Sequence, residues 1–134
     1  MLTAERVVTD VMSLLEHSAL SNEVTGKVYR EGYRPRDSRD EDIIVGFVTG
    51  TPRQVEYGAV TLHIYVADII NADGTSLKDG RRVAQIEQLA DAWVSSIKST
   101  TNYKFNLLRT ISSIADETSS QHIVVVQLDY QYKN

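Results

Sequence analysis

The sequence predicts an α+β domain in which two helices pack on one face of an antiparallel sheet of four to five strands. Two segments place apolar residues at helical spacing, and several others alternate with a period of two residues. The length of 134 residues suits one domain with one core. We therefore expect residues 1–134 to form a single α+β domain.

The first helical pattern lies near the amino terminus. Its apolar side chains fall within one arc of roughly 160° when each residue turns the helix by about 100°. These residues are Ala4, Val7, Val8, Val11, Met12, Leu14 and Leu15. Thr3 is the expected cap, because its hydroxyl can accept a hydrogen bond from a first-turn amide. Ser21 and Asn22 mark the expected end.

A second amphipathic pattern predicts a helix over residues 81–99. Its apolar residues share an arc of about 140°: Val83, Ile86, Leu89, Ala90, Trp93, Val94 and Ile97. Two starts remain open, either a capping box formed by Ser76 and Asp79 or Asp79 as the cap itself. Because each helix has one apolar face, both should pack against a single surface.

The first three predicted strands lie between the two helices. Residues 27–33 form a short strand, residues 43–48 an apolar one, and the segment after them alternates over the longest stretch of the chain. In that segment Val60, Leu62, Ile64 and Val66 point one way, and Thr61, His63 and Tyr65 point the other. This alternation predicts strands with one buried face.

Two further strands follow the second helix. Residues 103–114 are β-like but mixed in pattern, and residues 116–120 predict the turn of a hairpin. The final strand alternates, with Val124, Val126, Leu128, Tyr130 and Tyr132 on the face expected to be buried. The predicted order is therefore helix, three strands, helix, two strands.

A charged segment lies between two predicted strands at residues 34–42. Its charged residues are Arg34, Arg36, Asp37, Arg39, Asp40, Glu41 and Asp42. We expect an exposed, mobile loop. The carboxylates could bind a hard cation or act as an acid–base pair, but the interleaved arginines can neutralise them. Mixed charge of this kind also suits docking to a charged protein surface.

The sequence offers little support for a catalytic or metal-binding motif. The chain has no cysteine, which excludes a thiolate nucleophile, a zinc ribbon and an iron–sulfur cluster. His17, His63 and His122 lie on different predicted elements without metal-ligand spacing. Residues 71–74 resemble a calcium loop only superficially and predict a turn. We expect no catalytic residue, no metal and no cofactor.

The composition disfavours nucleic-acid and membrane partners. Eighteen acidic residues outnumber fourteen basic ones, which disfavours direct nucleic-acid recognition. Charged residues interrupt the apolar ones near the amino terminus, unlike a signal peptide. The longest wholly apolar run, residues 123–126, is far below the ~20 residues that cross a bilayer. We expect a soluble, intracellular protein with no membrane partner.

The order of elements and two short segments resemble a known family. Residues 26–29 (Gly-Lys-Val-Tyr) are followed, after a polar stretch containing proline, by residues 43–45 (Ile-Ile-Val). This arrangement resembles the tail terminator and tail-completion, or head–tail joining, proteins of long-tailed bacteriophages and prophages. The resemblance implies a non-enzymatic protein of the virion tail or neck, assembled in the bacterial cytoplasm. It implies a ring, commonly hexameric, that caps the tail-tube protein and meets the head connector protein.

Two polar connections between predicted strands are candidates for these contacts. One is the charged segment 34–42, and the other is the predicted hairpin tip at residues 49–56, with Arg53, Gln54 and Glu56 as its candidate contacts. Both flank strands, and arginine is common at interfaces. A ring also needs two different patches of one subunit to fit each other. We expect these two connections to supply much of the ring and tube contact.

Two alternatives remain open. The first is another connector or stopper protein of the head–tail junction, which would bind the portal side rather than the tube. The second is a small α+β enzyme or ligand-binding domain that uses the charged segment 34–42, with Asp37, Glu41 or His63 in its site. That alternative predicts a deep pocket with converging polar groups.

Overall fold

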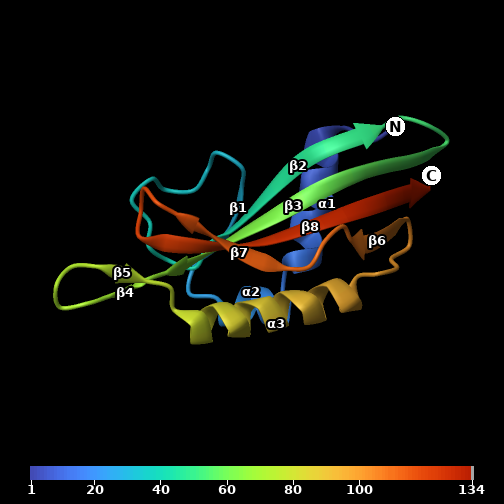
Figure 1. Cartoon of the computed structure of the whole chain (residues 1–134). Coiled ribbons are helices and arrows are strands. Elements are labelled where there is room, and N and C mark those ends of the chain that lie inside the picture. Colours follow the sequence, from blue (N-terminus) through green and yellow to red (C-terminus); the bar gives the residue numbers. More distant parts are fainter. Residues whose placement is uncertain (134) are drawn as a thin grey trace.

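A computed structural model describes residues 1–133 and confirms an α+β fold with a mostly antiparallel sheet (Figure 1). In chain order the elements are α1 (Ala4–Leu15), α2 (Ala19–Glu23), β1 (Val28–Arg30), β2 (Ile43–Thr51), β3 (Val55–Ala67), β4 (Ile69–Ile70), β5 (Ser76–Leu77), α3 (Gly80–Ser96), β6 (Tyr103–Leu107), β7 (Ser112–Asp116) and β8 (Gln121–Lys133). Among the helices of this described part, none is long and apolar enough to cross a membrane.

The main sheet has six strands rather than four or five. Its order is β1-β2-β3-β8-β6, and β7 also pairs with β8. The segment 103–114 forms two strands because β6 and β7 pair with successive halves of β8, through Leu107 opposite Leu128 and Ser112 opposite Val125. The mixed pattern of that segment thus reflects a break between two strands.

The expectation of a wholly antiparallel sheet is wrong at one edge. β1 runs parallel to β2, with Val28 opposite Ile43 and Arg30 opposite Val45. Parallel neighbours require a connection that returns the chain to the same end of the sheet. Residues 31–42 provide it, so the charged segment is a crossover connection between β1 and β2 and not a hairpin loop.

The two faces of the sheet differ as predicted. One face and the helices share a single buried cluster, to which β3 and β8 contribute Val60, Leu62, Ile64, Val124, Val126 and Leu128. Figure 1 shows α1 behind the long strands and α3 below them. The other side, which we call the open face, carries Ile44, Thr61, His63, Tyr65, Ile114, Ile123, Val125 and Gln127.

The amino-terminal helix begins as predicted but ends earlier. The Thr3 hydroxyl accepts a hydrogen bond from the Arg6 amide at 3.3 Å. α1 ends at Leu15, and His17 adopts a positive φ of 59°. Ser18 then caps the short helix α2 by accepting from the Ser21 amide at 3.0 Å. α2 has five residues, too few for a periodic pattern to reveal it.

The second predicted helix is α3, and its start is now decided. Asp79 caps it by accepting a hydrogen bond from the Arg82 amide at 3.1 Å. Near its other end, the Trp93 indole donates to the Leu14 carbonyl at 3.1 Å. This bond ties α3 to the last turn of α1.

Gly26 allows two parts of the chain to approach closely. Its amide donates to the Glu41 carbonyl at 3.2 Å, and the next amide, Lys27, donates to the Asp42 carboxylate at 2.9 Å. A Cβ on Gly26 would collide with Asp42 Oδ1. The position therefore needs glycine for space.

Candidate interaction surfaces

The charged segment 34–42 is anchored at both of its ends. Arg34 Nε donates to Asp42 Oδ2 at 2.8 Å, and Arg34 Nη2 donates to the Gln121 side chain at 3.0 Å. The guanidinium also lies 3.7 Å from the centre of the Tyr65 ring. Asp42 is only 2% exposed. The expectation of an exposed, mobile loop is therefore wrong at these two residues, which hold the segment to the sheet.

Asp42 remains ionised despite its burial. Burial alone would raise the pKa of this carboxyl. Hydrogen bonds from the Ser38 hydroxyl, the Lys27 amide and Arg34 outweigh burial and lower the pKa below its ordinary value. The carboxylate thus accepts hydrogen bonds from three donors of its own chain and is a structural group.

Glu41 is also part of the fold. It is 8% exposed, and its two oxygens accept from Arg82 at 2.6 and 2.7 Å. The hydrogen bond to Glu41 raises the pKa of Arg82. Arg82 Nη2 also donates to the Glu23 carbonyl at 3.0 Å. This bidentate pair joins the charged segment to α3 and corrects the expectation that Glu41 is exposed.

The middle of the segment does face solvent. Arg36, Asp37 and Asp40 are exposed. Arg39 is exposed as a residue, but its guanidinium donates to the Ser119 carbonyl at 2.8 Å. Within the predicted set, the side chains that are free to contact another molecule are therefore Arg36, Asp37 and Asp40.

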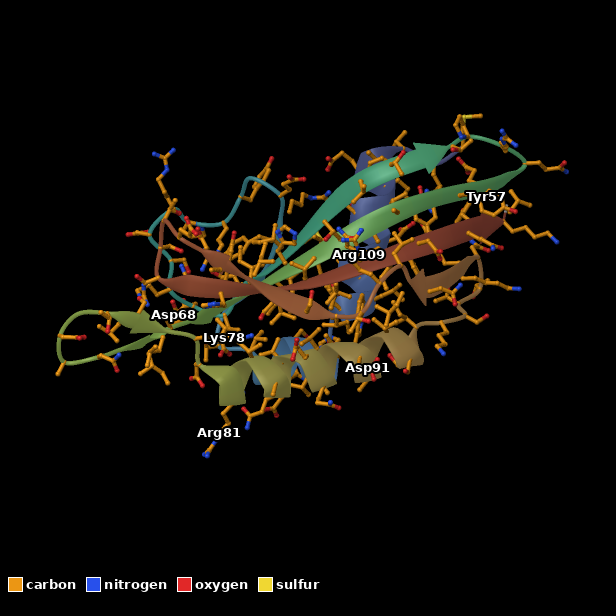
Figure 2. The ribbon with its side chains drawn as sticks, in the orientation of Figure 1. Tyr57, Asp68, Lys78, Arg81, Asp91 and Arg109 are labelled. Carbon is orange, nitrogen blue, oxygen red and sulfur yellow. The ribbon has the colours of Figure 1, made fainter. Side chains whose placement is uncertain are left out.

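The predicted hairpin tip at residues 49–56 lies at the end of the β2–β3 hairpin. Residues 49–54 are exposed, including Arg53 and Gln54. Val48 is 54% exposed at a register shift between Phe47 and Thr49, which indicates a β-bulge. Figure 2 shows Tyr57, 49% exposed, at the same end of the long strands.

Glu56 departs from this exposed set. It is 3% exposed, and both of its carboxylate oxygens lie 3.2 Å from the Leu2 amide. The expectation that Glu56 is a surface contact is therefore wrong, because its side chain points to the helix side of the sheet and holds the amino terminus. The available contacts at this tip are Arg53 and Gln54.

A second projecting hairpin was missed by sequence reasoning. β4 and β5 pair only with each other among the described strands, with Ile69 opposite Leu77. We call residues 68–79 the hairpin arm, and Figure 1 shows it extending away from the main sheet. Its turn, residues 71–74, was predicted. The signal that was overlooked is Ile69 and Ile70 before that turn and Leu77 after it.

The open face carries one titratable histidine near its middle. Burial lowers the pKa of His63, and the nearby Glu31 carboxylate opposes this effect. The Thr61 hydroxyl is buried and has no hydrogen-bond partner within residues 1–133. His63 and Thr61 are thus only partly exposed, although both lie on the open face.

The residues of the enzyme alternative do not converge. Glu41 binds Arg82 of α3, whereas His63 lies on the open face, and Asp37 is exposed on the crossover connection. In the part of the chain that the structure describes, no group of three or more acidic or histidine side chains has metal-binding geometry.

The sequence matches no protein-family model, and a search of curated proteins finds no similar chain.

Proposed function

We propose that this chain is a non-enzymatic assembly protein of a phage or prophage tail, a tail terminator that forms a ring on the tail tube. One observation carries the proposal. The exposed polar residues of the charged segment and of the hairpin tip lie at opposite ends of β2, because one group precedes Ile43 and the other follows Thr51. A head-to-tail ring requires two such separate patches on a rigid subunit.

The charge of these patches suits contact between polar surfaces. Arg36, Asp37 and Asp40 place both signs at one end of β2, and Arg53 places a positive charge at the other. Complementary charges steer an encounter and set its register. The internal ion pairs of Arg34 and Glu41 support this use because they hold the segment in one conformation, which reduces the entropy lost on association.

The proposed partners follow from the resemblance. The ring, commonly a hexamer, would contact the tail-tube protein on one side and the head connector protein on the other. The protein would then be a component of the virion tail or neck. A connector or stopper protein of the same junction is the neighbouring candidate, and copurification with tail-tube protein rather than portal protein distinguishes the two.

Charge reversal tests the two patches. Arg36→Glu and Arg53→Glu should each lower the fraction of assembled protein in sedimentation velocity, while the thermal unfolding transition stays within a few degrees of the original. Lys98→Glu, an exposed reversal next to the end of α3, is the matched control. Unchanged assembly in both patch variants would show that Arg36 and Arg53 are not part of the interface.

A further inference from the structure

The hairpin arm exposes three large aliphatic side chains to solvent. Ile69, Ile70 and Leu77 are 51%, 53% and 53% exposed. Ile69 and Leu77 are cross-strand partners and share one face, so Ile70 lies on the other. An isolated two-stranded hairpin is marginally stable in water. Each face of the arm therefore offers an exposed aliphatic side chain for contact with another molecule.

The arm is nevertheless held in one shape. At its base, Asp68 contacts His122 at 2.6 Å. At its tip, Asp73 accepts hydrogen bonds from the Thr75 amide at 3.1 Å and the Thr75 hydroxyl at 2.7 Å. Gly74 completes the turn with a φ of +87°, which glycine adopts without strain. A preorganised arm loses little entropy on docking.

A shallow hollow that is broadly open to solvent lies on the exposed side of α3. Its lining includes Ala84, Gln88 and Leu89 together with the charged residues Arg81 and Glu23. Figure 2 shows Arg81 pointing away from the body of the protein. The arm of the same chain extends away from α3 (Figure 1), so this hollow is not covered by its own arm.

We propose that the hairpin arm of one copy docks into the α3 hollow of a second copy of this chain. The Ile70 face of the arm would meet Ala84 and Leu89, and the Asp73 carboxylate at the tip would approach the Arg81 guanidinium. The two patches are different, as a head-to-tail contact requires. This inference rests on the proposed self-assembly and names the segment that carries it.

The absence of cysteine from the chain permits a direct test by disulfide cross-linking. Ala72→Cys in the arm and Ala84→Cys in the hollow are made in separate molecules, which are distinguished by a size tag and mixed under mild oxidation. Because a disulfide requires Cα atoms within about 7 Å, a mixed dimer reports contact between arm and hollow. Ala92→Cys is the matched control, since Ala92 also lies on α3 but outside the hollow.

The inference predicts mixed dimers from the Ala72→Cys and Ala84→Cys pair at a rate roughly tenfold above the Ala72→Cys and Ala92→Cys pair. Equal rates would overturn it. If the unmodified protein still sediments as a ring, only the arm contact is wrong and the proposed function stands. If the unmodified protein stays monomeric and does not bind tail-tube protein, the proposed function and the arm contact both fail.

A second pair of variants tests the energetic role of the arm. Ile70→Ser removes an aliphatic side chain from the arm, and Ile114→Ser removes one of equal exposure, 53%, from β7. The inference predicts that Ile70→Ser shifts the half-assembly concentration upward by about tenfold or more, since losing a buried isoleucine contact weakens association. Ile114→Ser should shift it by less than about twofold. Equal shifts would contradict a specific role of the arm.

Discussion

Arg34 and Asp42 form an ion pair of 2.8 Å that joins the start and end of the charged segment. The side chains are 13% and 2% exposed, so the pair is largely removed from solvent. Because Asp42 directly precedes β2 and Arg34 also contacts Tyr65 and Gln121, the pair fixes the crossover connection against the sheet. The residues between them are thereby presented as a defined surface.

Removing the charge of Asp42 should destabilise the protein strongly. In Asp42→Asn the Arg34 guanidinium loses its charged partner within a buried network, and losses of this kind are about 3 kcal/mol. Urea unfolding at neutral pH measures the free energy of unfolding directly. Asp37→Asn, an exposed substitution on the same segment, should change it by less than about 0.5 kcal/mol. Similar values for the two variants would contradict a structural role for Asp42.

The same carboxylate should make stability depend on acid. The folded protein lowers the pKa of Asp42 relative to the unfolded chain, where it is about 3.9. The stabilisation is therefore complete above that value and is lost as pH falls through the folded pKa. The difference between the original protein and Asp42→Asn should be constant from pH 7 to about pH 5 and should shrink toward pH 3. A difference that persists at pH 3 would show that ionisation is not its source.

His63 should add a second pH dependence closer to neutrality. Burial lowers the pKa of His63 in the folded protein, so the unfolded chain binds a proton first as the pH falls. Stability from the neutral imidazole is present above the unfolded value of about 6.5 and decreases below it. His63→Gln should reduce the change in unfolding free energy between pH 7.5 and about pH 5.5. An identical change in the variant would refute this assignment.

A pair of glycine substitutions tests the packing around the charged segment. Gly26→Ala would place a Cβ 2.7 Å from the Glu41 carbonyl oxygen as well as against Asp42, so backbone must move, at a loss of about 2 kcal/mol or more. At Gly80, where α3 begins, an added Cβ would meet no atom of residues 1–133 within 4 Å, apart from its own neighbours in the helix. Gly80→Ala should leave the free energy of unfolding unchanged or raise it by up to about 0.5 kcal/mol. Thermal and urea unfolding of both variants would measure these changes in stability, and equal losses in the two variants would contradict the prediction.

The periodic parts of the fold could be predicted from sequence. Alternation in β3 and β8 correctly separated Leu62 and Val126, in the core, from Thr61 and Gln127, on the open face. Helical spacing identified α1 and α3 because each has one buried stripe. These patterns depend only on which side chains are removed from water, which the sequence displays directly.

Features that depend on distant partners could not be predicted. The parallel direction of β1 results from the crossover connection, and Glu41 is buried because Arg82 of α3 lies against it. Asp42 is buried in the same connection by Lys27, Ser38 and Arg34. A charged residue next to other charged residues resembles a solvated loop unless its partner is known. Arg82, the partner of Glu41, lies 41 residues away on α3, and no local pattern connects the two.

The mass of the purified protein in solution tests the central proposal most directly. Sedimentation equilibrium over a concentration series, with and without tail-tube protein, would measure it. The proposal predicts a closed assembly of fixed subunit number, whose population grows with concentration or on addition of the tube protein. A single monomeric species under every condition, with no tube protein bound, would contradict it.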